Sequence, residues 1–180
     1  MIENIESIKK TIRTFQDFPI KGVSFMDLMP ILENPETMLM SIDVLVTMIK
    51  EKGWKFDYVA GLEARGFLFG VPVAMQLGCG FLPIRKKGKL PGPLIGTNST
   101  KEYGDDFLEI QDQQILKGAN VIIVDDLLAT GGTVRSAISL LTKAGCNVTG
   151  AAFLVELSYL DGGENLEVDY FAPITFNSEN

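Results

Sequence analysis

The sequence predicts an α/β fold with a mostly parallel central sheet and flanking helices, because strand-like and helix-like patterns alternate along the chain. Val121–Val124 is apolar and β-branched throughout, as in a central strand that is covered on both faces. A glycine-rich turn follows it, and Thr133–Ala144 then repeats apolar residues at helical spacing. With 180 residues, the chain suffices for one domain with a single core and is too short for two ordinary domains.

The alternation begins near residue 34. Asn34 is an N-cap candidate followed by proline, and the helical pattern of apolar residues after it stops at Gly53. Phe56–Leu62 is predicted as a strand. Phe67–Leu77 is predicted as a buried helix because it is apolar on all sides. Pro72 lies inside this helix, so we expect either a kink there or a later helix start.

The second half of the chain continues the pattern. Gly80–Ile84 is predicted as a short strand and Val148–Val155 as a buried one, while Gly145 ends the helix at residues 133–144. Residues 86–114 break the rhythm, since they are polar and rich in glycine and proline. A stretch of this length without clear structure is usually functional, which predicts a lid loop.

Composition and charge exclude several function classes. The formal net charge is −7, and an acidic chain does not attract nucleic acid non-specifically. The chain contains no histidine, which excludes Ser-His-Asp triads and histidine-ligated zinc and leaves oxygen-bound ions such as Mg²⁺. No apolar run approaches the roughly 20 residues of a membrane span. The acidic N-terminus is not a secretory signal, and Cys79 and Cys146 suit buried thiols, so we expect a cytoplasmic location.

The segment Val121–Thr133 carries the most specific chemical signal. A buried strand leads to two consecutive carboxylates, Asp125 and Asp126, and the loop after them opens a helix with Thr130-Gly131-Gly132-Thr133. Glycines let the backbone approach a ligand closely, and free N–H groups at a helix start attract phosphate. Because two acids would repel a phosphate, we expect them to serve ribose hydroxyls or a bound magnesium ion instead.

Two better-known phosphate-binding motifs are excluded, and one alternative, a purely structural role for the segment, remains. The chain has no Gly-Lys-Ser/Thr of a Walker motif, and Gly78-Cys79-Gly80 lacks the later glycine of the dinucleotide fingerprint. The alternative is an ordinary strand-loop-helix connection that uses glycines only for the turn. The coincidence of acid pair, glycines and threonines at a predicted strand end favours a ligand site.

This segment resembles the phosphoribosyl pyrophosphate signature of type I phosphoribosyltransferases. The resemblance implies the type I phosphoribosyltransferase fold, with a small hood and a mobile lid loop. It assigns the ribose hydroxyls to Asp125 and Asp126. It assigns the 5′-phosphate to the loop residues Ala129, Thr130, Gly131, Gly132 and Thr133.

Further segments resemble the adenine-specific branch of this family. Asp17–Leu28 is similar to its hood, in which backbone groups read adenine. Leu157, which ends the strand-like Leu154–Leu157, matches a position near the base. The hood residues that match adenine-binding positions are Val23, Ser24, Phe25 and Met26, and the family often has arginine where Met26 stands.

Two basic segments resemble the diphosphate site of the same family. Ala60–Gly70 matches its pyrophosphate loop and assigns the diphosphate to Arg65, whose planar fork can bridge two oxygens. Arg85–Pro93 begins with four cations in five residues, which in an acidic protein indicates a polyanionic ligand. The resemblance gives Arg85 and Lys89 pyrophosphate roles, in part across a dimer interface. The alternatives are a surface ion pair for Arg65 and a solvated loop for the basic run.

The catalytic residue implied by the resemblance is Glu102. Lys101–Asp105 is similar to the family's loop segment that carries an acid/base beside the purine. In a chain without histidine, a carboxylate is chemically suited to this task. Taken alone, a loop glutamate would be interpreted as merely solvated.

The resemblance as a whole implies an enzyme of purine salvage that converts adenine and 5-phosphoribosyl 1-pyrophosphate into AMP and pyrophosphate. Mg²⁺ would arrive with the ribosyl donor, near Asp125. One domain is expected over residues 1–180, with the hood around 1–30 and the lid around 86–114, in a homodimer without nucleic-acid or membrane partners.

Two alternatives stay open at this point. The first is a transferase for xanthine, guanine or hypoxanthine, because the phosphate loop cannot separate the purines. The second is a non-catalytic regulator that senses the ribosyl donor. Transcriptional members of this fold add a DNA-binding domain, for which 180 residues leave little room.

Overall fold

A computed structural model describes residues 1–97, 107–164 and 166–178 of the chain. Its helices are α1 (Ile2–Lys9), α2 (Met29–Glu33), α3 (Pro35–Lys52), α4 (Arg65–Leu77) and α5 (Gly132–Lys143), with the 3₁₀ turns η1 (Gln114–Leu116) and η2 (Ser158–Leu160). Its strands are β1 (Arg13–Phe15), β2 (Phe25–Asp27), β3 (Tyr58–Leu62), β4 (Gly80–Lys86), β5 (Leu94–Gly96), β6 (Leu108–Gln111), β7 (Asn120–Leu128), β8 (Asn147–Leu157), β9 (Tyr170–Phe171) and β10 (Ile174–Phe176).

The main sheet confirms the predicted α/β fold. Its strand order is β10-β8-β7-β3-β4-β6-β5, and β9 pairs with β8 beside this row. The strands from β10 to β4 run parallel, whereas β6 and β5 continue the sheet in antiparallel fashion. Because parallel strands end at a common edge, the turns that follow β3 and β7 come together there.

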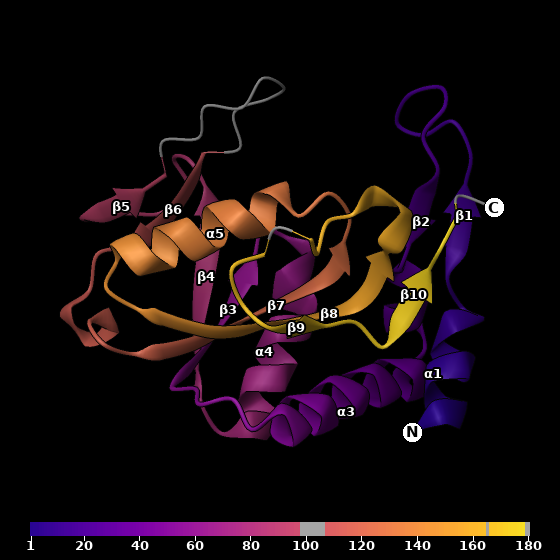
Figure 1. Cartoon of the computed structure of the whole chain (residues 1–180), viewed down its shortest axis with the longest axis horizontal. Helices are drawn as coiled ribbons and strands as arrows, with labels where there is room; N and C mark the ends of the chain where they lie inside the picture. Colours follow the sequence, from indigo (N-terminus) through magenta and orange to yellow (C-terminus); the bar gives the residue numbers. More distant parts are fainter. Residues whose placement is uncertain (98–106, 165, 179–180) are drawn as a thin grey trace.

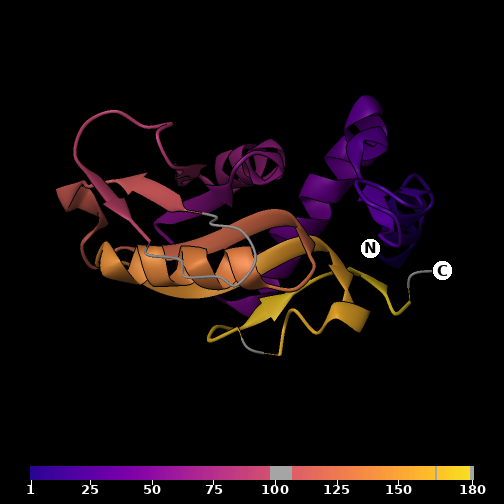
Figure 2. The same ribbon diagram turned by 90° about the horizontal axis from the view of Figure 1, so that it is seen from above.

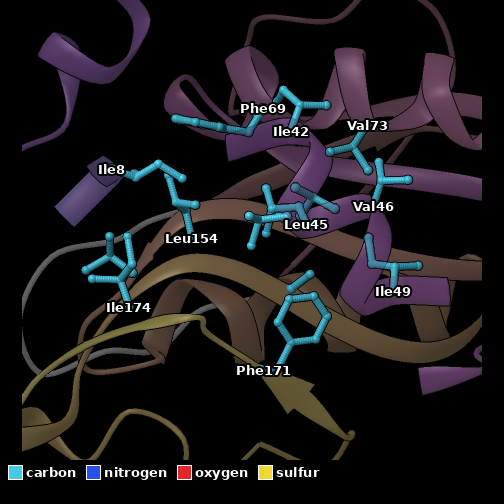
Figure 3. Close-up of a cluster of buried hydrophobic side chains, with 14 of the residues drawn as sticks. Ile8, Ile42, Leu45, Val46, Ile49, Phe69, Val73, Leu154, Phe171 and Ile174 are labelled. Carbon is cyan, nitrogen blue, oxygen red and sulfur yellow. The ribbon is translucent and has the colours of Figure 1, made fainter. Parts of the chain in front are cut away.

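Helices cover both faces of this sheet (Figure 2). One apolar cluster joins α1, α3 and α4 to one face, and Figure 3 shows part of it, including Phe69 and Leu154. A second cluster joins α5 to the other face, where Phe153 is fully buried. Alternate residues of β8 thus serve opposite cores, as expected of a strand covered on both sides.

Two N-terminal strands do not belong to the main sheet. Strands β1 and β2 form a separate antiparallel pair, held by an ion pair of 2.6 Å between Arg13 Nη2 and Asp27 Oδ2. Figure 1 shows β7 and β8 pointing toward the side of the molecule where β1 and β2 lie. The segment expected as a hood is therefore next to the ligand-binding edge.

Most predicted element boundaries hold to within a few residues. The Asn34 side chain accepts a hydrogen bond from Glu36 N (2.8 Å) and caps α3, and Gly53 ends this helix with φ +67°. Strand β7 runs further than predicted, to Leu128, so Asp125 and Asp126 lie within the strand rather than after it. Its pairing with the long strand β8 extends through these residues and holds them in extended form.

Two sequence predictions were wrong in part. Helix α4 starts earlier than predicted, at Arg65, and continues through Pro72, and it is not buried all round, because Leu68, Val71 and Met75 are exposed. The predicted structureless stretch 86–114 contains β5 and β6, whose short pairing adds the antiparallel edge of the sheet. Weak local patterns concealed both strands, since each has only three or four residues.

Candidate functional site

A cavity of about 270 Å³ opens where β3 and β7 end. It lies between the start of α4 and the loop that joins β7 to α5. Its lining residues are Leu62, Glu63, Ala64, Arg65, Lys86, Asp125, Asp126, Leu127, Leu128, Ala129, Thr130, Gly131, Gly132, Thr133 and Val134. Eight residues predicted from the sequence, namely the five of the phosphate loop, the two acids and Arg65, therefore meet in one place.

The phosphate loop has the backbone geometry that its glycines suggested. Gly131 caps α5 with φ +72°, a left-handed conformation that favours glycine. The first N–H groups of α5, from Gly132 on, lack carbonyl partners within the helix, and the positive end of the helix dipole lies with them. The loop thus offers the cavity a concave set of donors suited to an anion such as a phosphate monoester.

The two acids form a closely spaced pair of like charges, in which Asp126 is buried and Asp125 is partly buried. Asp126 N donates to Asp125 Oδ1 (2.9 Å), and the Asp125 carboxylate packs against the first turn of α4, where a Cβ on Gly66 would lie 2.7 Å from it. Burial raises the pKa of both carboxyl groups. The nearby charge of Asp126 raises the pKa of Asp125 further, well above its usual range.

Arg65 is the cation that balances this pair. Its Nε lies 2.7 Å from Asp126 Oδ2, and its charge opposes the rise in the Asp126 pKa caused by burial. The contact is an ion pair without hydrogen-bond alignment, and Asp126 Oδ2 has no hydrogen-bond donor among the described residues. A buried carboxylate oxygen that still lacks a donor suits a hydroxyl-bearing ligand.

The same guanidinium connects the site to the hood. It lies 5.9 Å from the centre of the Phe25 ring, which packs edge-on against Phe18 at 5.1 Å. Val23 is exposed, and the Ser24 hydroxyl donates to Gln16 Oε1 within the hood (2.7 Å). The Phe25 ring therefore lies within cation–π range of Arg65, one of the cations that line the cavity.

In contrast to Val23, Met26 and Leu157 are buried. Both residues are 5% exposed and belong to the apolar cluster of α1, α3 and α4. The sulfur of Met26 accepts a hydrogen bond from the Thr14 hydroxyl on β1 (3.4 Å). Any contact of Met26 with a ligand would thus have to come from its backbone. Leu157, at the end of β8, is similarly limited to shaping the wall behind a ligand.

Two acidic side chains accept hydrogen bonds from the basic segment Arg85–Pro93. Glu63 accepts a hydrogen bond from Arg85 Nε (3.0 Å) and another from Lys86 N (2.8 Å), and these bonds hold the pKa of Glu63 below its usual range. Glu109 accepts a hydrogen bond from Gly88 N (2.8 Å). Both acids thereby fix the backbone of the basic turn.

Arg85 and Lys89 do not line the cavity, whereas Lys86 does. Arg85 packs its guanidinium over the Phe67 ring at 5.7 Å, and Lys89 is exposed on the turn after β4. Sequence reasoning missed Lys86 and Glu63. The available signal was strand alternation: neighbouring residues of β4 point to opposite sides, so Arg85 and Lys86 cannot both face the cavity.

The remaining predicted features are the catalytic glutamate and the metal. Glu102 lies outside the described residues. Across the described ranges, no group of three acidic, cysteine or histidine side chains is arranged to hold a metal ion. Asp125 and Asp126 could supply only two carboxylate ligands. Such a pair suits a magnesium ion that takes most of its ligands from a donor's phosphates and from water. In the same ranges, no helix is long and apolar enough to cross a bilayer.

Comparisons with known proteins agree with this geometry. Residues 30–179 match the phosphoribosyl transferase domain. The chain is 48% identical over 172 residues to the adenine phosphoribosyltransferase of Caenorhabditis elegans, covering 95% of this chain and 93% of that protein. It is 47% identical over 163 residues to the enzyme of the same name from a Thermoanaerobacter strain, covering 91% and 93% of the two chains.

Solved structures give the same result. The adenine phosphoribosyltransferase of Thermoanaerobacter pseudethanolicus superposes with a TM-score of 0.90 at 45% identity and covers 96% of this chain and 99% of its own. The Saccharomyces cerevisiae enzyme, solved with adenine and an imino-altritol bisphosphate, has a TM-score of 0.91 at 39% identity, with 97% and 100% covered. The chain therefore belongs to the adenine phosphoribosyltransferases, within the phosphoribosyltransferase family.

Proposed function

We propose that this chain transfers the phosphoribosyl group of 5-phosphoribosyl 1-pyrophosphate to adenine, and that the cavity between β3 and β7 holds the donor. The observation that carries the assignment is the joining of phosphate loop, acid pair and Arg65 around one cavity. The phosphate loop suits the 5′-phosphate, and the acids suit the ribose hydroxyls. Arg65, on the opposite wall, suits the diphosphate.

The reaction breaks the bond between C1′ and the diphosphate oxygen, and the diphosphate departs with the bonding electron pair. Positive charge builds on the sugar, as in glycoside hydrolysis. Arg65 and Lys86 line the cavity and stabilise the growing charge of the departing anion, while Arg85 and Lys89, which lie outside this lining, add positive potential from the same basic segment. A purine nitrogen then attacks C1′ from the opposite face. Adenine and donor become AMP and pyrophosphate, with one proton leaving the purine ring.

Glu102 is our candidate for the group that exchanges this proton. The chain has no histidine, so a carboxylate is the natural acid/base for the step. Mg²⁺, when bound with the donor, supplies charge neutralisation at the phosphates. We further assign base recognition to hood residues 23–26, within the hood around residues 1–30. Within the expected lid around residues 86–114, β5 and β6 belong to the sheet, so we assign closure over the site to the segment between these two strands.

The direct test incubates the purified protein with phosphoribosyl pyrophosphate, Mg²⁺ and one purine at a time, and follows nucleotide formation. AMP from adenine alone supports the proposal. Product only from xanthine, guanine or hypoxanthine keeps the donor site and contradicts the assigned base. Donor binding without product from any purine contradicts the proposed reaction and favours a sensor of the donor.

Replacing Glu102 by leucine should lower kcat by roughly 10²- to 10⁴-fold, because the proton would lose its carrier. The KM for the donor should change far less, since the residue is not assigned to donor binding. Steady-state kinetics with both substrates measures this, and Glu51→Leu, an exposed glutamate of α3, is the matched control. Unchanged turnover in Glu102→Leu would remove Glu102 from the mechanism.

We also propose that the protein works as a homodimer. Leu68, Val71 and Met75 follow each other at helical spacing along α4 and are 43%, 40% and 76% exposed. An apolar stripe of this kind on a well-packed helix is typical of a surface that another chain covers. The stripe begins one turn after Arg65, so a second copy there would lie close to the diphosphate site.

Met75→Glu should convert the proposed dimer into a monomer, because a charge would be buried in the contact at the most exposed residue of the stripe. Light scattering coupled to gel filtration measures the molar mass of the variant. Ile115→Glu is the control, since Ile115 is 63% exposed in η1 and belongs to a different surface. A dimer that persists in Met75→Glu and dissociates in the control would place the interface elsewhere.

A further inference from the structure

A short segment after β8 lies against the back of the phosphate loop. We call residues 158–164 the backing segment. It begins with η2, turns at Asp161 with φ +51°, and is closed by hydrogen bonds from Asp161 N to Ser158 O (3.1 Å) and from Glu164 N to Asp161 O (3.2 Å). None of its residues lines the cavity, and the sequence motifs did not include it.

The backing segment and the phosphate loop contact each other through backbone atoms. A Cβ on Gly162 would overlap the carbonyl oxygen of Ala129 and would lie 3.0 Å from Gly131 N. In the reverse direction, a Cβ on Gly131 would overlap the carbonyl oxygen of Gly162. Gly162 is buried, and its φ lies outside the left-handed region. Glycine is therefore needed at 162 for space and not for backbone conformation.

The backing segment is itself anchored to the sheet. The Ser158 hydroxyl donates to Phe176 O on β10 (3.1 Å) and to Asn177 Oδ1 (2.8 Å). On the other side, a Cβ on Gly163 would overlap the Tyr170 hydroxyl, and this hydroxyl donates to Glu156 Oε1 on β8 (2.9 Å). The phosphate loop thus rests on a support fixed to β8, β9 and β10.

We propose that Gly162 is a positioning residue for the 5′-phosphate, an inference that rests on the proposed function of the loop. Phosphate binding by a loop depends on several N–H groups converging on one point. With Gly162 behind Ala129 and Gly131, the loop cannot relax away from the cavity. A side chain at 162 pushes the loop toward the space that the phosphate occupies, although residue 162 never touches the phosphate.

The test is Gly162→Ala, with Glu164→Ala in the same segment as the matched control, because Glu164 is exposed. Affinity for ribose 5-phosphate and the KM for phosphoribosyl pyrophosphate should each worsen by roughly 10²-fold, as expected for misplaced binding groups. Pyrophosphate affinity and the KM for adenine should stay within about threefold, since those subsites lie on other elements. Isothermal titration and steady-state kinetics measure the four quantities, and circular dichroism checks the fold.

An equal loss in all four quantities would mean general damage and would overturn the proposal, as would normal ribose 5-phosphate binding in Gly162→Ala. A wild-type protein that binds no ribose 5-phosphate would instead contradict the proposed function itself. If Gly162→Ala does not fold, hydrogen exchange of the wild type decides. Adding ribose 5-phosphate should slow exchange in residues 158–164 together with 129–133, and slowing confined to 129–133 would overturn the proposal.

Discussion

Replacing Arg65 by alanine should lower kcat/KM for phosphoribosyl pyrophosphate by roughly 10³-fold, as expected when a preorganised charge that stabilises the leaving group is lost. The same change should lower the free energy of unfolding by about 2 kcal/mol, because it leaves Asp126 buried without its cation. This figure is below the usual cost of breaking a buried pair, since the Arg65 side chain is 37% exposed and water screens it. Urea unfolding and initial rates measure both effects.

The control variants separate the two roles of Arg65. Arg65→Lys keeps the positive charge but loses the planar guanidinium that can bind two oxygens. Compared with Arg65→Ala, it should therefore recover much of the stability and little of the activity. Adding Asp126→Asn to Arg65→Ala should also restore stability, because no buried charge then lacks a partner. Arg65 lowers the Asp126 pKa, so its loss costs stability at neutral pH and costs less once acid protonates Asp126. A stability loss that is equal at pH 7 and in acid would contradict this account.

Replacing Asp125 by asparagine should stabilise the protein at pH 7 by roughly 0.5–2 kcal/mol, the usual gain when a strained functional group is removed. Asparagine keeps an acceptor for Asp126 N and removes the charge that opposes Asp126. The folded-state pKa of Asp125 is raised, so the wild type loses stability as pH rises through this pKa. The advantage of the variant should therefore disappear as pH falls toward about 4, the unfolded-state pKa.

The same variant should be a poor enzyme. Its kcat/KM should fall by about tenfold to a hundredfold, the effect of losing a charged hydrogen-bond acceptor for ribose. Urea unfolding between pH 4 and 8 measures the stability difference, and Asp112→Asn, in an exposed loop, should change stability by less than about 0.5 kcal/mol. If Asp125→Asn is less stable than the wild type at pH 7, the expectation is contradicted. The contacts of the Asp125 carboxylate would then contribute more free energy to the folded state than the desolvation of its charge costs.

The parts of the site that could be predicted from sequence are local in the chain. Strand β7, the loop and α5 are consecutive, so the order of apolar residues, acids and glycines already specifies which groups share the cavity. The same applies to α3, where a capping asparagine and a terminal glycine stand at its two ends. In both cases the residues that fix the local backbone conformation lie within about one helical turn of that backbone in the sequence.

The parts that could not be predicted depend on pairings between distant segments. Whether Arg85 or Lys86 faces the cavity is fixed by the register of β3 against β4, which pairs Leu62 with Ile84. The burial of Met26 depends on how β1, β2 and α1 pack on the sheet. The exposed stripe of α4 was missed because composition alone cannot distinguish a helix covered by its own chain from one left for a partner.

One edge of the main sheet is the three-residue strand β5, and the other is shared by the short strands β9 and β10, which both pair with β8. Pro93 directly precedes β5 and Pro173 directly precedes β10, and proline has no N–H to offer to another strand. Such blunt edges resist the strand-to-strand stacking that leads to aggregation, even though the strands between them are strongly apolar. The dimer proposed to form through α4 would therefore meet no competition from an open-ended ladder of backbone hydrogen bonds.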